Sequence, residues 1–578
     1  MNSGRFFPRL RVAFFFILAA SFFTGIHGRP QAPGSPAELK LQASCPLQLT
    51  ARGEAELLGY VDTARLNDLF RPNFEDYRSE TKEFYNSFCN SLPWIQGTKP
   101  TRQARELIRE IQTAADKGLK PEDYDGPLWD ERLAAFESLS PLSESALLRF
   151  DVALTVSTMR YLSDLRIGRI NPRAAHFELN VYDKKLDLSD YLKYVIVTAQ
   201  DVPAAVEGVE PQFPAYRRTL HALQNYRELA RRDDGEVLPS PRNAIQPGHS
   251  YSGVPRLVRL LTLLGDFPNV DAKTPRRMIY EGSLVDAVKH FQQRNGLETS
   301  GSIDSSTLGE LNTPLGRRVL QLQLTLERWR WLPQNLGSPL IVVNIPEFRL
   351  HVVSEEHRVA FSMNVVVGKA FHHPTPVFAS EIKAVIFRPF WNVPPEIQHN
   401  EFVPELEKNP LYLVENSFEI VDARGNVVEG DPLTGELLQQ LRSGLLGLRQ
   451  KPGPANSLGL IKFEMPNPYD IYLHATPASE LFSKSRRDFS HGCIRLEDPV
   501  ALAAWVLRNK SEWTTDRMRA AMNGEENLRV NLDKPVAVLV LYGTAVVKED
   551  GQVFFFRDIY SLDEELEKAL ANGNSPSK

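Results

Sequence analysis

Residues 472–495 read Tyr472-Leu473-His474, then fifteen further residues, then Ser490-His491-Gly492-Cys493-Ile494-Arg495. Nucleophilic catalysis by a cysteine needs a thiolate, together with a base or a cation that lowers the pKa of the thiol. Cys493 supplies the sulfur, and two histidines lie within reach of it in the sequence. We expect His474 at the end of a strand and His491 in a tight loop. No other part of the sequence places a cysteine beside a histidine.

Gly492 is the second informative feature of this stretch. A glycine lets the backbone approach a substrate closely, so the amides of Gly492 and Cys493 could form part of an oxyanion hole. Each residue alone has a plain structural explanation, because a single histidine is most often a hydrogen-bonded structural residue. The combination and its spacing favour a catalytic site.

The length and composition of the chain limit the class of protein that carries this site. With 578 residues the chain is too long for one ordinary core, so several structural units are expected. Hydrophobic residues make up 42% and charged residues 24%, as in soluble globular proteins. The formal net charge of −5 gives no basic excess, which argues against nucleic acid as a partner.

The N-terminus has the order of a secretory signal. Arg5, Arg9 and Arg11 precede an apolar run over 12–23, and small and polar residues follow. The run is short for a transmembrane helix. We therefore predict a signal peptide over 1–28 and export to the periplasm, with an uncleaved anchor in the inner membrane as the alternative.

Export implies an oxidising compartment for the three cysteines. Cys45 and Cys89 lie near the mature N-terminus and could form a disulfide, worth roughly 4 kcal/mol on the chain-entropy estimate. Cys493 is then left unpaired. An unpaired cysteine in an exported protein indicates either a reactive thiol or a buried, inert residue.

Shifts in periodicity divide the chain, and they predict a multidomain α+β protein. Apolar residues recur at helical spacing up to about residue 240, and β-branched and aromatic runs begin near 339. An insertion over 400–455 interrupts the β-rich region, and we interpret it as a cap because such long insertions are usually functional. The other predicted segments are a linker over 29–50, a helical scaffold over 51–240, a three-helix module over 251–313, a connecting helix over 317–335, a β-rich catalytic domain over 336–547 and a C-terminal tail over 548–578.

The three-helix module carries the first resemblance to a known family. Its residues 287–293 and 301–308 closely resemble the three-helix peptidoglycan-binding module. The resemblance implies that 251–313 binds peptidoglycan. The alternative is that the module only packs against its neighbours and binds nothing.

The spacing His-x(15)-Ser-His-Gly-Cys-x-Arg closely resembles the signature of the L,D-transpeptidase family, which has a YkuD-type catalytic domain. The order of scaffold, binding module and capped catalytic domain resembles the large Gram-negative members of the YcbB type. The resemblance covers about residues 100–545. Further matching stretches are Val343-Asn344-Ile345-Pro346, Val367-Gly368-Lys369, Thr375-Pro376, Trp391-Asn392-Val393-Pro394-Pro395 and Pro466-Asn467.

The resemblance implies catalytic roles. Cys493 would be the nucleophile and His474 the general base, with its ring oriented by a main-chain carbonyl in place of an acidic residue. Tyr472 would hold the oxyanion together with the amides of Gly492 and Cys493. No cofactor is implied.

Four further residues are expected on the oxyanion and substrate side of the site. Ser490 and His491 belong to the loop. His491 is expected to shape this loop and to contact substrate, with a catalytic role in proton transfer as the alternative. Arg495 either neutralises a substrate carboxylate or braces the loop. Trp391 either lines the cleft or is an ordinary core tryptophan.

A metal site is not expected from the sequence. His372 and His373 are adjacent, so they would point apart on a strand, and no third ligand stands out.

As the family implies, Cys493 attacks the third residue of a tetrapeptide stem of peptidoglycan and releases D-Ala. The thioester then passes to an amine of a second stem, the side chain of meso-diaminopimelate, which gives a 3→3 cross-link. Carbapenems are expected to acylate the same thiol, and cell-wall synthesis proteins are candidate partners. The rivals are a cysteine L,D-carboxypeptidase or endopeptidase on the same fold, and a non-catalytic peptidoglycan-binding protein.

Overall fold

The computed structural model describes residues 48–138, 140–179, 181–268, 278–334, 336–356, 358–428 and 433–572. The predicted signal peptide, most of the predicted linker and Cys45 lie outside these residues. Among the helices described, none is long and apolar enough to cross a membrane.

The N-terminal part is helical and is built around α5 (Glu144–Ile167). Ser143 caps this helix by accepting a hydrogen bond from the Ala146 amide. Most of its side chains are buried on every face, so the shorter helices pack around it and share one apolar core. These helices are α1 (Ala51–Thr63), α2 (Arg78–Ser87), α3 (Arg102–Gln112), α4 (Trp129–Ala134), α6 (Leu188–Tyr191) and α7 (Val202–Glu207). The next helix, α8 (Pro214–Arg232), contributes its buried side chains to a separate apolar cluster.

The predicted three-helix module has its own core. It consists of α9 (Val254–Leu263), α10 (Ser283–Arg294) and α11 (Ser305–Leu311). Asp304 caps α11 by accepting a hydrogen bond from the Thr307 amide.

α12 (Leu315–Trp331) joins the helical part to the β-rich part. It packs against α5 and α8, and Glu327, Arg330 and Trp331 are fully buried. Arg169 Nε lies 3.3 Å from Glu327 Oε2, which pairs the buried carboxylate. A buried charge is tolerated only with such partners, so this ion pair ties α12 specifically to the helical part.

The β-rich part is one nine-stranded sheet in the order β12-β5-β13-β11-β10-β6-β14-β3-β4. Because β4 also pairs with β5, the strands from β5 to β4 close into a ring, and their apolar side chains contribute to one large core of the described residues. The strands are β3 (Leu340–Asn344), β4 (Arg349–Val353), β5 (Val359–Gly368), β6 (Phe378–Phe387), β10 (Ile461–Glu464), β11 (Leu473–His474), β12 (Asp488–Ser490), β13 (Ile494–Leu496) and β14 (Leu528–Leu541). Helices α17 (Pro499–Val506) and α18 (Thr515–Asn523) lie between β13 and β14 in the chain. The predicted α+β fold class is confirmed.

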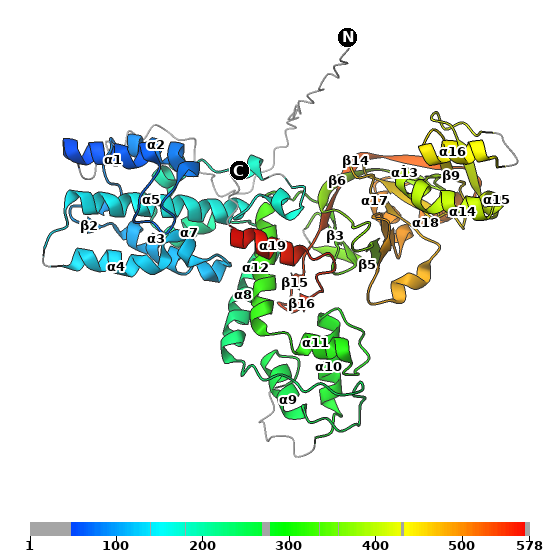
Figure 1. Ribbon diagram of the computed structural model, residues 1–578, viewed down its shortest axis with the longest axis horizontal. Coiled ribbons are helices and arrows are strands. Elements are labelled where there is room, and N and C mark those ends of the chain that lie inside the picture. The colour runs from blue at the N-terminus through cyan, green and yellow to red at the C-terminus, as the bar shows by residue number, and fades with distance from the viewer. Residues whose placement is uncertain are drawn as a thin grey trace, which may run out of the picture. The chain divides into compact units, whose positions relative to one another are not determined.

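The predicted insertion folds as a separate unit, which we call the cap (residues 391–450). Its apolar residues form a cluster of their own, and its helices gather beside β9 in Figure 1. The unit begins at β7, before the predicted start at 400, because β7 pairs with β9 at the far end of the insertion. Its elements are β7 (Trp391–Asn392), α13 (Pro395–Ile397), the π-helical turn η9 (Gln398–Phe402), α14 (Val403–Lys408), α15 (Tyr412–Glu415), β8 (Phe418–Val421), α16 (Gly435–Ser443) and β9 (Gly447–Gln450).

The prediction of a tail over 548–578 is wrong for its described residues. β15 (Ala545–Val547) pairs with β16 (Val553–Phe555), and α19 (Leu562–Asn572) follows. Asp563 anchors this helix by accepting from Arg328 of α12 over 2.5 Å. The segment folds back because its aromatic residues and Leu566 are buried.

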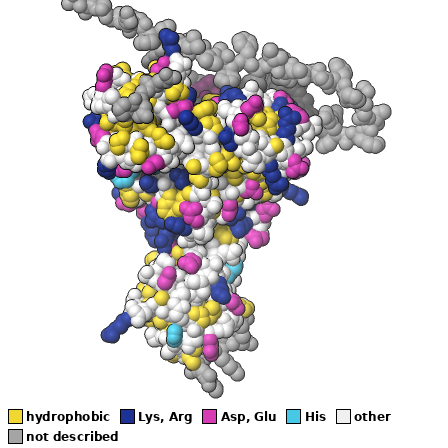
Figure 2. All heavy atoms as spheres, turned by 90° about the vertical axis from the view of Figure 1, so that its right-hand side faces the viewer, with side chains coloured by type: hydrophobic (Ala, Val, Ile, Leu, Met, Phe, Trp, Pro, Cys, Tyr) yellow, Lys and Arg dark blue, Asp and Glu magenta, His cyan; other side chains and the backbone are white. Residues whose placement is uncertain are grey.

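The surface is mixed in character. On the face shown in Figure 2, basic and acidic side chains are interspersed, so a ligand meets both signs of charge. Leu411, Val414 and Leu445 are among the most exposed large apolar side chains, and all three belong to the cap.

Candidate active site

Strand pairing brings the two halves of the motif together. β11 runs parallel to β13, with Leu473 opposite Ile494 and His474 opposite Arg495. The Ile494 amide donates to the Tyr472 carbonyl over 3.1 Å. Two parallel neighbours need a connection between them, and the spacer between His474 and Ser490 supplies it. The predicted strand end and loop are thus adjacent in space.

The Cys493 thiol is partly exposed. Its Sγ lies 3.7 Å from the Asp470 carbonyl. Burial raises the pKa of the thiol, whereas hydrogen bonds from the backbone and hydroxyl of Tyr472 and the charges of Lys462 and Arg495 lower it. The sulfur is therefore reachable and has partners that favour a thiolate, but desolvation keeps the resting group protonated.

His474 is almost completely buried, with an exposed fraction of 4%. Its Nδ1 lies 2.6 Å from the Ala475 carbonyl, which can only accept, so Nδ1 carries the proton. Burial lowers the pKa of the imidazole to about 3, helped by the charge of Arg495, while hydrogen bonds to the Ala475 and Leu458 carbonyls act in the opposite direction. The neutral ring keeps its basic lone pair on Nε2. A main-chain carbonyl orients this histidine, as the resemblance implied.

Tyr472 contacts both partners. Its ring centroid lies 5.6 Å from that of His474, and its hydroxyl is hydrogen-bonded to Cys493. Burial and the neighbouring thiol raise the pKa of Tyr472 well above its usual value, so the phenol stays a hydrogen-bond donor. This position fits the predicted oxyanion role.

The loop 490–493 is held by an internal network. Ser490 Oγ donates to the Cys493 carbonyl over 2.6 Å and accepts from the Gly492 amide over 3.2 Å. The Gly492 amide is thus used inside the loop, which differs from its predicted oxyanion role. The Ser490 side chain is buried, and its two hydrogen bonds stabilise the loop that carries Cys493.

Gly492 is needed for a conformational reason. Its φ of 108° lies in the region that favours glycine, and a Cβ would sit 3.0 Å from Ile471 Cδ1. Thr375 fixes the same glycine, since its Oγ1 donates to the Gly492 carbonyl over 2.7 Å and accepts from the Gly368 amide over 2.9 Å. This role of Thr375 could not be predicted from the sequence, because Gly368 and Gly492 lie far apart along the chain.

Lys462 is a site residue that sequence reasoning missed. It stands opposite His474 across β10 and β11, and its Nζ lies 3.8 Å from the centroid of the Tyr472 ring. In the sequence it stands between two apolar residues, Ile461 and Phe463, as expected of a strand whose side chains alternate between the two faces of a sheet. Only the pairing of β10 with β11 reveals its place.

Arg495 flanks the catalytic pair and is partly buried. Among the described residues, its Nε has no hydrogen-bond partner. A guanidinium with a free N–H suits a substrate carboxylate, which is one of its two predicted roles.

Trp391 packs in the core of the cap, which is one of its two predicted environments. Its ring packs edge-on against Phe402, with centroids 5.8 Å apart. Its side chain is also hydrogen-bonded to Tyr472. The cap therefore contacts Tyr472 directly, and the role of Trp391 in lining a cleft stays a prediction.

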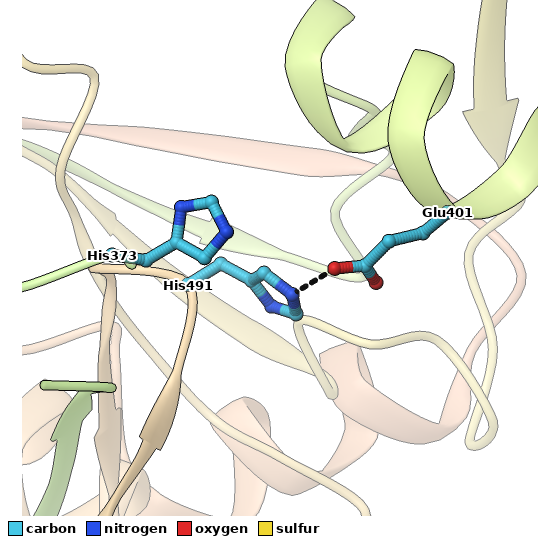
Figure 3. Close-up of side chains that lie close together, drawn as sticks. All are labelled: His373, Glu401 and His491. Atoms are coloured by element: carbon cyan, nitrogen blue, oxygen red, sulfur yellow. Dashed lines mark hydrogen bonds and ion pairs between the residues drawn. The ribbon is translucent and has the colours of Figure 1, made fainter. Parts of the chain in front are cut away.

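His491 links the loop to the cap, because its Nε2 lies 2.6 Å from Glu401 Oε1 on η9. His373 lies next to His491. One potential ligand atom from each of His373, Glu401 and His491 falls within 4.8 Å of the other two (Figure 3). Two potential metal ligands, Glu401 and His491, thus lie near His373 although both come from segments distant in sequence. Its neighbour His372 is not part of this group.

Cys89 is exposed. Its pairing with Cys45 stays a prediction, because Cys45 lies outside the described residues.

Known families match three parts of the chain. A scaffold domain matches residues 79–223, a "Putative peptidoglycan binding domain" matches 250–311, and the L,D-transpeptidase catalytic domain matches 338–538. These matches confirm the family resemblance stated from the sequence.

Individual proteins are similar as well. The chain is 30% identical over 252 residues to a "Putative L,D-transpeptidase" of Haemophilus influenzae, a match that covers 44% of this chain and half of that relative. L,D-transpeptidase 3 of Mycobacterium tuberculosis is similar at 16% identity, over 35% of this chain and 60% of that one, with a TM-score of 0.16. An L,D-transpeptidase of Stackebrandtia nassauensis is similar at 15% identity, over 52% and 97%, with a TM-score of 0.21.

Thr375→Val should loosen the nucleophile loop. The substitution leaves the buried Gly368 amide and Gly492 carbonyl without their hydroxyl partner, so the free energy of unfolding should fall by about 1–3 kcal/mol. Urea unfolding followed by circular dichroism measures this change. Thr375→Ser retains the hydroxyl and should stay near the wild type; an equal loss in both variants would contradict the role of the hydroxyl.

His474 should make stability depend on pH. Its pKa of about 3 in the folded protein lies below the ordinary 6.5, so the unfolded chain takes up the proton first as the pH falls. Its contribution is complete above pH 6.5 and is lost toward pH 3. Relative to His474→Asn, the wild type should lose up to roughly 1.4 kcal/mol per pH unit in this window. A difference in unfolding free energy that stays constant from pH 7 to pH 4 would show that the ring is not desolvated.

Proposed function

Residues 338–538 belong to the L,D-transpeptidase catalytic-domain family, and from this premise we propose that the chain forms 3→3 cross-links in peptidoglycan through a Cys493 thioester. The observation that carries the proposal is the partly exposed Cys493, hydrogen-bonded to Tyr472 and placed directly before the strand that pairs with the one carrying the neutral, Nδ1-protonated His474. These are the parts that covalent acyl transfer requires.

In the first half-reaction, the Cys493 sulfur attacks the carbonyl of the third residue of a donor stem. The thiol proton passes to His474 Nε2 as the S–C bond forms, and the Tyr472 hydroxyl donates to the developing oxyanion. The carbonyl then re-forms, and the C–N bond to the terminal D-Ala breaks. His474 returns its proton to the leaving amine, so the thioester forms with a neutral histidine.

In the second half-reaction, the side-chain amine of diaminopimelate on another stem attacks the thioester. His474 accepts the amine proton, and the tetrahedral carbon collapses with loss of the Cys493 sulfur. The sulfur regains that proton from the imidazolium. The products are a 3→3 cross-link and the starting enzyme.

The low pKa of His474 suits the two half-reactions. A ring with a pKa of about 3 is neutral at physiological pH, so it is ready to accept a proton. It is a weak base, and the positive charge that it gains must be transient. Catalysis therefore depends on proton transfer during attack rather than on a preformed ion pair of thiolate and imidazolium.

The cap supports acyl transfer over hydrolysis. It contacts the site at two points, Trp391 to Tyr472 and Glu401 to His491. Excluding water protects a thioester that must wait for an amine. Hydrolysis by an L,D-carboxypeptidase remains the second candidate, because the Cys493 side chain is partly exposed and water can reach it.

The module at 250–311 is proposed to bind peptidoglycan. A polar surface pocket on α10 supports this, since it offers donors and acceptors suited to a glycan or a peptide stem. Its lining residues are Asp286, Lys289, His290, Gln293 and Thr299. Export to the periplasm is proposed from the arginine-flanked apolar run at the N-terminus.

Purified tetrapeptide stems should yield cross-linked dimers with loss of D-Ala, detected by mass spectrometry. Cys493→Ala should abolish product, because no other group can form the acyl-enzyme. The exposed cysteine gives a matched control: Cys89→Ala should keep wild-type activity. Free tripeptide without any dimer would contradict transpeptidation and indicate the hydrolase, while product from Cys493→Ala would contradict thiol catalysis altogether.

A further inference from the structure

Three side chains from distant parts of the chain converge beside the nucleophile loop. One ligand atom from each of His373, Glu401 and His491 lies within 4.8 Å of the other two. His491 Nε2 is 2.6 Å from Glu401 Oε1, and the two imidazole rings have centroids 5.0 Å apart at an interplanar angle of 50°. Figure 3 shows the carboxylate of Glu401 pointing at the His491 ring, with His373 beside it.

The two histidines are held on loops that pack tightly together. A Cβ on Gly368 would lie 2.0 Å from the His373 carbonyl and 3.0 Å from Gly492 Cα. Thr375 bridges the same segments through its hydroxyl. The backbone of the two loops is therefore closely packed, and this packing keeps the two histidine side chains near each other.

Glu401 is also presented by an anchored segment. It lies on η9, a π-helical turn, and such turns occur frequently at functional sites. Gln398 fixes the turn, since its Nε2 donates to the Leu441 and Leu446 carbonyls over 2.7 and 2.9 Å, and its Oε1 accepts from the Leu448 amide over 2.7 Å.

We propose that His373, His491 and Glu401 bind a divalent transition-metal ion, Zn²⁺ in particular, which ties the cap to the nucleophile loop. Two imidazole nitrogens and one carboxylate oxygen form a common zinc ligand set, and a fourth tetrahedral position is left for water. Ca²⁺ and Mg²⁺ prefer ligand sets made of oxygen alone.

The three ligand atoms need only small movements to reach the spacing of a tetrahedral zinc site. Ligand atoms around a tetrahedral zinc ion lie about 3.3 Å apart, given metal–ligand distances of about 2.0 Å. The His491–Glu401 pair must lengthen by less than about 1 Å, and His373 must approach by about 1.5 Å. Side-chain rotation supplies both movements. The His491 and Glu401 side chains are 25% and 47% exposed, so an ion reaches them from solvent.

A bound ion would act on the proposed reaction, and this consequence rests on the proposed function. His491 is two residues from Cys493, and Glu401 belongs to the cap. Binding would replace one hydrogen bond between cap and loop by two metal–ligand bonds across the same gap. The ion would hold the cap closed and slow the exchange of donor and acceptor stems.

The test uses the untagged full chain in the Cys493→Ala background, freed of metal with a chelator and titrated with ZnCl₂ by calorimetry. One ion per chain should bind. His373→Gln, His491→Gln and Glu401→Gln should each weaken binding about tenfold or more. His372→Gln and His399→Gln are matched controls, because they remove neighbouring histidines outside the group, and they should bind as the parent does.

Because Cys493 is absent from this background, binding is measured independently of transpeptidation. Equal affinity in all five variants, or no saturable binding up to millimolar ZnCl₂, would overturn the proposal. Circular dichroism of each variant in chelator separates loss of a ligand from loss of the fold. In chain with intact Cys493, stoichiometric ZnCl₂ should lower the rate of dimer formation, and Glu401→Gln should remove that sensitivity.

Discussion

The parallel pairing of β11 with β13 is the interaction on which the rest of the site depends. It sets His474 opposite Arg495 and joins Tyr472 to Ile494, so the proposed general base and the proposed nucleophile are placed by backbone hydrogen bonds. A shift of this register by one residue would turn His474 to the other face of the sheet. Ser490, Gly492 and Thr375 then fix the short loop that carries Cys493.

Desolvation dominates the electrostatics of the pair. It raises the pKa of Cys493 and lowers that of His474, so both groups rest uncharged. Lys462 and Arg495 place two cations near the sulfur, and these stabilise the thiolate once it forms. The site is thus arranged for charge that develops during the reaction. The buried surroundings that penalise resting charge also strengthen each hydrogen bond to the transition state.

The sequence predicted the fold class, which is confirmed. The pair of Cys493 and His474 was predicted from a motif that combines a thiol, an imidazole and a glycine at fixed spacing, and the catalytic roles of this pair stay a prediction. The family resemblance also predicted that a main-chain carbonyl would orient His474. Lys462, His373 and Glu401 could not be found in this way, because their places depend on strand pairing and on a cap contact between residues far apart in the chain. The predicted tail was wrong at α19 for a similar reason, since its anchor Asp563 pairs with Arg328 of a distant helix. The predicted oxyanion role of the Gly492 amide overlooked Ser490, whose hydroxyl occupies that amide locally.

The central claim is that a stem peptide becomes esterified to one particular sulfur. The most direct measurement is acid quenching of a single turnover with donor stem alone, followed by proteolysis and tandem mass spectrometry. The account predicts a tripeptide stem attached as a thioester to the fragment that contains Cys493. Product release with no adduct on that fragment, or an adduct on a different residue, would contradict it.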